Sequence, residues 1–296
     1  MIVKIFDVPR MKQKIPYVLA ENQQIILMPV GDFHYGVKHF PKDRFKKHFK
    51  WGLDRGAYFL GMGDYIDFAS YSQRMLMAPM RDETRMIIAE KVTDMIEQLT
   101  AILEPTRGRW IGLLEGHHRF EFLDGTSSDQ LLCEKLGCDF LGTSTMITLR
   151  FKGVPIDRPE AFPIIFAHHG ISTSRTMGGQ LHRLEDLLKW QPETDIFLMA
   201  HSHAKITGTV DAQKLTPPPE CILYHETKIA ARTGGWLKQY NAIRPQLLSL
   251  PAVKSRGTYV EEKLFSPTAL GGLCFGIGYG RISGSGLYRP TIHYSV

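Results

Sequence analysis

The sequence predicts an α/β fold in which strands alternate with helices and form a sheet that is covered on both sides. Short apolar runs that are typical of buried strands alternate with longer segments whose apolar residues recur at helical spacing. This alternation is typical of βαβ units, in which a helix connects two parallel strands. A third observation concerns polar residues, because a short segment that contains Asp or His follows each of five apolar runs within two residues. Such placement favours a site built at the ends of strands.

The elements follow one another in a regular order along the chain. The predicted strands are apolar runs of five or six residues at 25–30, 57–62, 110–114, 162–167 and 196–200. The predicted helices each carry an apolar stripe and occupy residues 42–55, 82–103, 128–136 and 178–190. Pro105 ends the second helix, and the Thr-Ser-Ser-Asp stretch at 126–129 begins the third.

Residues 205–296 differ from the rest of the chain in composition and in periodicity. Three consecutive prolines stand at 217–219, no long helical period follows them, and glycines interrupt short strand-like runs such as 258–264 and 273–279. The glycine-rich stretch at 276–280 precedes no helix, so it predicts a hairpin rather than a phosphate-binding loop. We therefore expect one domain over residues 1–296, in which 205–296 form a β-rich extension that completes or covers a sheet.

The net charge of +6 is concentrated in this extension. Residues 204–296 hold 11 Lys and Arg against 5 Asp and Glu. A basic segment favours a polyanionic substrate, because it raises the local concentration of phosphates. An ordinary solvated surface explains the same charges equally well, and no tight Lys and Arg cluster marks a nucleic-acid interface.

The apolar runs exclude a membrane-spanning or secreted protein. None approaches the ~20 residues that span a bilayer, and charged residues and prolines interrupt the N-terminal segment. The four cysteines form no Cys-x-x-Cys pair, which favours reduced core residues. We therefore expect a cytoplasmic protein without membrane contact.

Five segments place carboxylates or imidazoles directly after predicted strands. They are Gly-Asp-Phe-His at 31–34, Gly-Asp-Tyr-Ile-Asp at 63–67, Gly-His-His at 116–118, His-His-Gly at 168–170 and His-Ser-His at 201–203. Alternate side chains of an extended backbone share a face, so Asp-x-His and His-x-His can each present two donors to one point. The carboxylate of Asp64 can bridge two cations through its two oxygens.

Oxygen and nitrogen donors of this kind suit two divalent ions of intermediate softness. We expect Mn first, with Fe, Zn, Co or Ni as alternatives. Two such ions about 3.5–4 Å apart can activate a bridging water and stabilise both oxygens of an in-line phosphoryl displacement. The candidate ligands are Asp32, His34, Asp64, His117, His169, His201 and His203.

In this order the five segments resemble the motifs of the calcineurin-like metallophosphoesterase superfamily. Its motifs are Asp-x-His, Gly-Asp-x-x-Asp, Gly-Asn-His, His-Gly and Gly-His-x-His, and the likeness covers residues 25–240. It is closest to phage- and prophage-encoded members, which have similar Ala-His-His-Gly and Arg-Thr-x-Gly-Gly stretches, here at 167–170 and 175–179. The resemblance implies a four-layer α/β/β/α sandwich of two mixed β-sheets flanked by helices, whose second sheet the β-rich extension would complete or cover.

The resemblance also implies a role for each residue. It assigns one metal to Asp32, His34 and His203 and the other to His117, His169 and His201, with Asp64 as the bridge. His118 matches the family's catalytic histidine, which lies near the substrate phosphate and can protonate the leaving oxygen. Asp67 matches the carboxylate that fixes the tautomer and ring angle of that histidine.

Two positions depart from the family pattern. His117 stands in the place of the family's Asn, so an imidazole replaces a neutral oxygen donor and makes binding of the second metal more pH-dependent. A rival register makes His117 catalytic and His118 merely adjacent, but we prefer the first register because Gly116 fixes the alignment. It predicts that His117 directs a ring nitrogen at the second metal while His118 faces the open side. Ala200 replaces a family Gly, which requires only a backbone conformation open to Ala.

Three further residues are candidates for contacts with substrate. Arg119 follows the catalytic-looking histidine and either binds phosphate or pairs with Glu121. Arg175 lies just before a predicted helix, where it either holds a phosphate oxygen or belongs to an ordinary capped loop. His168 is a neighbour of the metal ligands. Trp236 either stacks on a base or fills the core position of a strand.

Together these expectations describe a metal-dependent phosphoric ester hydrolase. The leading hypothesis is a phosphodiesterase or nuclease that cleaves diesters of DNA, RNA or nucleotides with a hydroxide that bridges the metals. The alternative is a phosphomonoesterase acting on a nucleotide or phosphoprotein, because the family supports both chemistries with the same residues. A third possibility is a module that binds phosphate without turnover. The sequence disfavours it, because no candidate metal ligand is lost. A phage-encoded protein would act in the host-cell cytoplasm.

Overall fold

A computed structural model describes most of the chain. It covers residues 17–20, 24–37, 40–69, 74–75, 77, 79–152, 154, 162–170, 174, 176–215, 221, 223–236, 270–281 and 288–295. Within these ranges the protein has an α/β structure with two mixed sheets and four α-helices. None of the described helices combines the length and the apolar composition that a membrane crossing needs.

The first sheet contains five strands. Its order is β11-β10-β2-β3-β4, with bounds Tyr288–Ser295, Cys274–Arg281, Gln24–Val30, Tyr58–Gly61 and Trp110–Leu113. The strands β2, β3 and β4 are parallel, whereas β10 pairs antiparallel with both β2 and β11. The parallel strands are almost continuously buried, which explains why they are visible in the sequence as unbroken apolar runs.

The second sheet contains six strands. Its order is β1-β5-β6-β7-β9-β8, with bounds Tyr17–Ala20, Ser144–Phe151, Ile164–His168, Ile196–Met199, Leu223–Thr233 and Lys205–Leu215. The strands β6, β7 and β9 are parallel, and β5 and β8 join the sheet antiparallel. Buried and half-buried residues alternate along β5, so only one of its faces is packed in a core.

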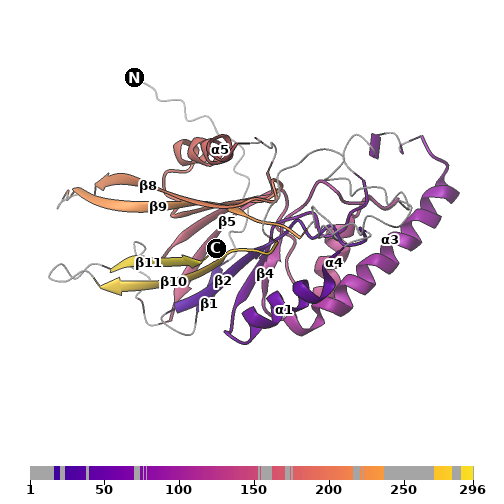
Figure 1. The fold of residues 1–296 in the computed structure, drawn as a ribbon, viewed down its shortest axis with the longest axis horizontal. Helices are drawn as coiled ribbons and strands as arrows, with labels where there is room; N and C mark the ends of the chain where they lie inside the picture. Colours follow the sequence, from indigo (N-terminus) through magenta and orange to yellow (C-terminus); the bar gives the residue numbers. More distant parts are fainter. Residues whose placement is uncertain are drawn as a thin grey trace, which may run out of the picture.

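The two sheets pack face to face, and the helices lie on their outer faces (Figure 1). Leu27 and Leu60 from the first sheet share one core with Ile147, Ile165 and Leu198 from the second. A second core fills the space between the first sheet and the helices α1 (Lys42–Leu53), α3 (Asp82–Leu103) and α4 (Ser128–Leu136). The helix α5 (Met177–Trp190) packs on the second sheet.

The α/β class with two mixed sheets is therefore confirmed, and both sheets are covered on both faces. Each sheet has helices on one face and the other sheet on the opposite face. The sequence did not reveal every strand of these sheets. In β8 (KITGTVDAQKL), for example, polar residues outnumber apolar ones, because this strand lies at a sheet edge.

Residues 205–296 contribute strands to both sheets. The hairpin β8–β9 lies at one edge of the six-stranded sheet, and β10–β11 lies at one edge of the five-stranded sheet. The glycine-rich residues 276–280 form part of β10, where they pair antiparallel with β11. The three prolines at 217–219 and the strand-like run at 258–264 lie outside the described residues.

Local signals explain where α4 begins and ends. Ser127 accepts a hydrogen bond from the backbone N–H of Gln130, whose side chain in turn accepts one from the N–H of Ser127. Gly137 ends the helix in a left-handed conformation, with φ 68°. This fixed start matters for the site, because the second residue of the helix is Asp129, whose carboxylate reaches the loop at 116–118.

Candidate metal centre

The five polar segments meet at one end of the two sheets. Each follows the carboxyl end of a strand, namely β2, β3 and β4 in the first sheet and β6 and β7 in the second. Parallel neighbours end at the same edge, so their following loops lie side by side. Backbone hydrogen bonds tie these loops together, as in the N–H groups of Asp32 and His34 that donate to the carbonyls of Gly63 and Asp64 over 2.9 and 3.0 Å.

The candidate ligands form four overlapping groups. Within each group one ligand atom per residue lies within 4.8 Å of the others. The groups are Asp32, His34 and His203; His117, His169 and His201; Asp32, Asp64 and His169; and His34, Asp64 and His118. All seven residues that the sequence proposed as ligands therefore lie in one continuous cluster, together with His118. These groups of His and Asp could hold metal ions.

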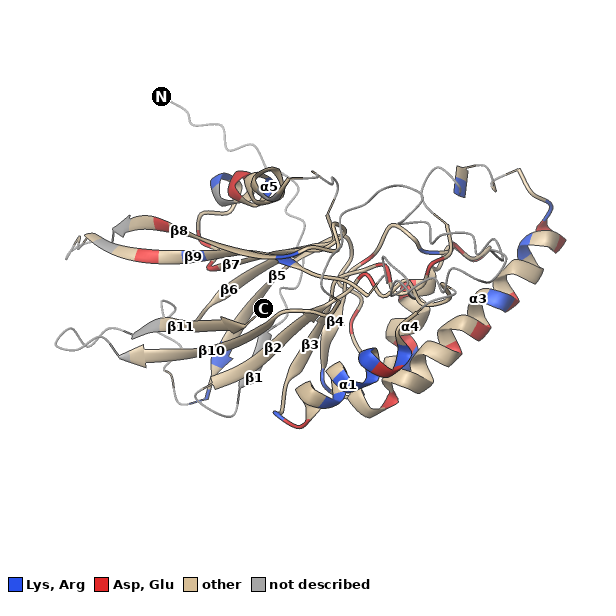
Figure 2. Cartoon of the chain, viewed as in Figure 1, with Lys and Arg blue, Asp and Glu red and all other residues tan. Residues whose placement is uncertain are grey.

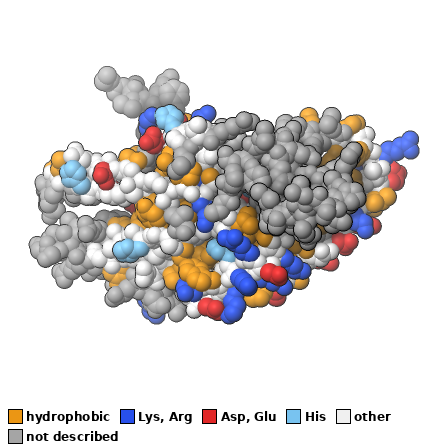
Figure 3. All heavy atoms as spheres, in the orientation of Figure 1, with side chains coloured by type: hydrophobic (Ala, Val, Ile, Leu, Met, Phe, Trp, Pro, Cys, Tyr) orange, Lys and Arg blue, Asp and Glu red, His pale blue; other side chains and the backbone are white. Residues whose placement is uncertain are grey.

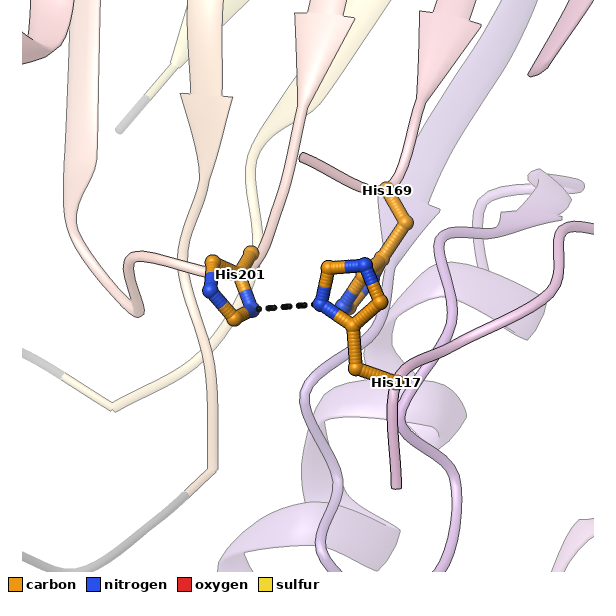
Figure 4. Close-up of side chains that lie close together, drawn as sticks. All are labelled: His117, His169 and His201. Carbon is orange, nitrogen blue, oxygen red and sulfur yellow. Dashed lines mark hydrogen bonds between the residues drawn. The ribbon is translucent and has the colours of Figure 1, made fainter. Parts of the chain in front are cut away.

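Three imidazoles from both sheets converge in one of these groups (Figure 4). His117 lies after β4, and His169 and His201 lie after β6 and β7. The Nδ1 atoms of His117 and His201 are 3.2 Å apart, and the ring centroids of His117 and His169 are 4.6 Å apart. Three imidazole nitrogens in one place are a donor set that suits Zn, Cu, Fe or Ni.

Hydrogen bonds fix which ring nitrogen faces the cluster. His169 Nδ1 lies 2.6 Å from the carbonyl oxygen of Met62, which can only accept, so this nitrogen carries the proton. His169 Nε2 then points its lone pair at the cluster, 3.2 Å from Asp64 Oδ2. His34 Nδ1 likewise donates to Asp67 over 3.2 Å, which leaves His34 Nε2 facing Asp64 at 3.8 Å. Metal-binding histidines are commonly oriented in this way.

The cluster contains buried polar atoms that no described residue satisfies. They are Asp32 Oδ1 and Oδ2, His34 Nε2, His169 Nε2 and His203 Nδ1. An unpaired buried polar atom destabilises a fold by about 1–3 kcal/mol. All five atoms offer lone pairs when the rings are neutral and the carboxylate is ionised, so a cation would satisfy them together. The donor set therefore fits a metal ion.

The charges of the imidazoles agree with this interpretation. Burial, followed by the charge of His169, lowers the pKa of His117 to about 4 and that of His201 to about 3. Burial also lowers the pKa of His203. These three rings are neutral at pH 7, which is the state that a metal ligand needs.

Asp32 and His169 have pKa values that a bound cation would change. Burial raises the pKa of Asp32 to about 7, and the nearby Asp64 carboxylate adds to the effect. Burial lowers the pKa of His169, but attraction to Asp64 outweighs it and raises the value to about 9. A divalent ion beside these groups would favour the ionised carboxylate and the neutral ring, since it replaces protons.

The backbone is strained at the same residues. Six non-glycine residues in the described ranges have positive φ, and five of them are candidate ligands: Asp32, His34, Asp64, His201 and His203. Their φ angles lie between 47° and 65°, in the left-handed region that costs L-residues about 1–3 kcal/mol. Strain of this kind persists where the surrounding structure holds it, and it clusters at functional sites.

Close backbone approach is also built into the cluster. A Cβ added to Gly116 would lie 2.0 Å from the backbone nitrogen of Asp64, and one added to Gly235 would lie 2.9 Å from His203 Nδ1. The backbone N–H of Trp236 donates to the carbonyl of Asp32 over 2.9 Å. Residues 235 and 236 therefore form one wall of the cluster, which the sequence did not reveal.

His118 and Asp67 lie at the rim of the cluster. His118 Nδ1 is 3.0 Å from Asp67 Oδ1, and the His118 side chain is 28% exposed. Burial raises the pKa of Asp67, but hydrogen bonds from His118 and His34 outweigh this effect and lower it below its usual range. Asp67 is therefore ionised and accepts hydrogen bonds from both rings.

The three proposed substrate contacts have different surroundings. Arg119 forms ion pairs with Glu115 over 2.8 Å and with Glu121 over 3.0 Å, so the pairing that the sequence suggested is observed. His168 Nδ1 accepts a hydrogen bond from the N–H of Gly170 over 2.7 Å. Arg175 lies outside the described residues. Trp236 is buried, with 1% exposure, and occupies a core position rather than an open stacking surface.

Sequence reasoning missed the residues that support the ligand loops. Asp129 is buried and accepts a hydrogen bond from the N–H of Gly116 over 2.8 Å, and burial raises its pKa to about 7. Arg74 donates to the carbonyls of Ala69 and His117. Arg232 is fully buried and donates to the carbonyl of Ala200 over 3.2 Å. These contacts join residues 5 to 43 positions apart, and no local pattern marks them.

A scan against protein-family models and a search of the curated proteins both found no match.

Proposed function

We propose that the chain is a metal-dependent phosphoesterase of the calcineurin-like superfamily, with that superfamily's four-layer sandwich fold. The preferred substrates are phosphate diesters of nucleic acid or nucleotides. One observation carries the proposal: five motifs that are separate in the sequence meet in one cluster of buried donors without partners among the described residues. Helices outside two facing sheets are consistent with the proposed fold.

The geometry supports two ions that share Asp64. Asp32, His34 and His203 would hold one ion, and His117, His169 and His201 would hold the other. Asp64 Oδ2 lies 3.8 Å from His34 Nε2 and 3.2 Å from His169 Nε2, between the two groups. When bound, divalent ions would supply Lewis-acid stabilisation of phosphoryl oxygens and lower the pKa of a water molecule. Mn is the first candidate, because the donors combine imidazoles with carboxylates.

The chain's own residues would handle the proton of the leaving group. His118 lies at the open rim, and its Nδ1 is held by the ionised Asp67. This contact leaves Nε2 as the nitrogen that can reach a substrate. His118 would give its Nε2 proton to the departing alcohol oxygen, and Asp67 would keep the ring oriented.

Hydrolysis of diesters by metal-loaded protein tests the proposal. We expect turnover of a dinucleotide and of a bis-aryl phosphate diester, with slower turnover of an aryl monoester. His118→Ala should slow dinucleotide cleavage by about 10²–10⁴-fold, the usual contribution of a general acid. The substitution should slow cleavage of the bis-aryl diester much less, because an aryl oxide of low pKa, such as nitrophenolate, leaves without a proton.

His182→Ala is a matched control. His182 lies on the exposed side of α5, 3.4 Å from Glu185, and should leave both rates unchanged. Intact diesters in the presence of each metal, or equal dinucleotide rates for the wild type and His118→Ala, would contradict the proposed function. Faster turnover of the monoester would identify a phosphomonoesterase instead.

A further inference from the structure

A pocket of ≈ 380 Å³ lies beside the metal cluster but does not include it. It is bounded by α1, the start of β8 and the chain just before β10, and none of the seven candidate ligands lines it. Trp236 separates the two sites, since its backbone N–H donates to Asp32 while its side chain lines the pocket. The volume falls in the range of small-molecule sites, which is about 300–1,000 Å³.

The charged residues that line this pocket are all cationic. Arg44 and Lys47 come from α1, and Lys205 comes from β8, an edge strand of the six-stranded sheet. The described lining contains no Asp or Glu. Figure 2 marks several Lys and Arg positions in blue along α1, and Figure 3 shows blue Lys and Arg side chains on the face that it draws. Cations brought together from a helix and a distant strand favour an anionic ligand.

Two residues that line the pocket have buried ring nitrogens without partners among the described residues. Trp236 is 1% exposed, and its Nε1 has no hydrogen-bond partner among the described residues. Nε2 of His48, whose ring centroid lies 5.0 Å from that of Trp236, has no described partner either. An indole N–H can only donate, so its missing partner is an acceptor. An anion would provide that acceptor and would neutralise the surrounding cations.

The electrostatic field at His48 agrees with this assignment. Burial lowers the pKa of His48 to about 4, and the charges of Lys205 and Arg44 lower it further in the same direction. Both cations therefore act on the ring that lines the pocket. One N–H of Arg44 donates to the carbonyl of Leu270 over 3.2 Å, and the remaining guanidinium donors can still bind an oxyanion.

We propose that this pocket binds the phosphate group of a mononucleotide-sized ligand, independently of the metal cluster. Arg44, Lys47 and Lys205 supply charge for the phosphate, and Trp236 supplies a buried N–H donor. Trp51 lines the rim, is 39% exposed, and can pack against a nucleobase. The guanidinium of Arg55 lies 4.2 Å from the Trp51 ring centroid and occupies only one of its faces.

Titration of the full-length protein with AMP tests the proposal, with adenosine as the ligand that lacks phosphate. Quenching of tryptophan fluorescence reports on binding, because Trp51 and Trp236 both line the pocket. We expect saturable binding of AMP by the metal-loaded protein and again after chelation, and no comparable response to adenosine. Binding that survives chelation distinguishes this pocket from the metal centre, so the result is separate from the test of phosphoesterase activity.

Charge-removing substitutions inside and outside the pocket provide the matched comparison. Lys47→Gln and Lys205→Gln should each weaken AMP binding about tenfold, the effect of losing one charge-assisted hydrogen bond. Lys46→Gln removes the same charge from a residue of α1 that does not line the pocket, and it should leave the affinity unchanged. Equal affinities of Lys47→Gln and Lys46→Gln, equal binding of adenosine and AMP, or loss of binding on chelation would each overturn the proposal.

Discussion

Two clusters of polar atoms without described partners lie on either side of residues 235 and 236. They differ in the charge of the ligand that would satisfy them. On one side Asp32, His34, His169 and His203 bury lone pairs without described donors. On the other side Trp236 buries an N–H without a described acceptor, beside cationic side chains. The first pattern suits a cation and the second suits an anion. A thin wall of two residues thus separates two sites of opposite preference.

The difference also shows how each site was assembled. Every candidate ligand of the cation cluster belongs to a short motif at the end of a strand, so the sequence could indicate which residues lie together. The anion pocket combines a helix, a strand and a loop from distant parts of the chain. Its residues form no motif, and only the fold brings them together. Motifs therefore identify sites that one edge of a sheet builds, whereas pockets between elements require a structure.

Removal of the charge that the two metal groups share should produce the largest effect. Asp64→Asn keeps the shape and the acceptor oxygen for the N–H groups of His117 and His118, but it cannot bridge two cations. We expect metal content to fall to one ion per chain or fewer, and diester turnover to fall about a thousandfold. Elemental analysis and initial rates measure both quantities.

Asp54→Asn is the control for this substitution, because Asp54 lies on the surface and pairs with Lys50 over 2.9 Å. Its metal content and rate should equal those of the wild type. AMP binding should also persist in Asp64→Asn if the two clusters are independent. Unchanged metal content in Asp64→Asn would show that Asp64 is not a shared ligand.

A side chain placed in the wall should disturb the cation cluster next. A Cβ at position 235 would lie 2.9 Å from His203 Nδ1 and 3.0 Å from Asp32 Cβ, so both groups would have to shift. We expect Gly235→Ala to lower metal affinity about tenfold and to destabilise the fold by about 1–3 kcal/mol. Chelator competition and urea unfolding provide the two measurements.

The same change at an open position gives the matched control. A Cβ at Gly178, on α5, meets nothing within 4 Å. Gly178→Ala should therefore raise stability by up to about 1 kcal/mol through helix propensity and leave metal affinity unaltered. If both glycine variants bind metal as tightly as the wild type, residue 235 is not part of the wall.

The sequence predicted the central elements closely and the edges poorly. The helix predicted at 82–103 has those bounds in the structure, because its apolar stripe packs Val92, Ile96 and Leu99 into a core. The edge strand β8 was missed, since its exposed positions carry polar residues. Most of the strand pairings in the two sheets also involve strands that the sequence did not reveal, namely β1, β5, β8, β9 and β11.

For the site, the sequence revealed the types and the order of the candidate ligands. It did not reveal the residues that support their loops or the strained backbone at the ligands. The left-handed backbone of Asp32 and Asp64 and the hydrogen bond between Asp129 and Gly116 result from tertiary packing. The sequence also suggested that His117 makes binding of the second metal sensitive to pH. Because burial lowers the pKa of His117 to about 4, protons compete for this ring only in acid.

The smallest expected effect concerns the anion pocket and the pH dependence of folding. His48 has a pKa of about 4 in the folded protein, below its ordinary value of 6.5, because of burial and the charges of Lys205 and Arg44. The unfolded chain therefore binds a proton below pH 6.5 that the folded chain does not bind. Stability from this group is complete above pH 6.5 and is lost as the pH falls towards 4.

Between pH 7 and pH 5 we expect this group alone to reduce the free energy of unfolding by about 1–2 kcal/mol. His48→Gln removes the titrating ring and should flatten that part of the urea-stability profile. At pH 7, added AMP should raise the free energy of unfolding of the wild type, because the ligand binds the folded state. The increase should be smaller for Lys47→Gln, which binds AMP more weakly. An identical pH profile for His48→Gln and the wild type would show that the pocket does not hold His48 neutral, and the contrast between the two clusters would then depend on Trp236 alone.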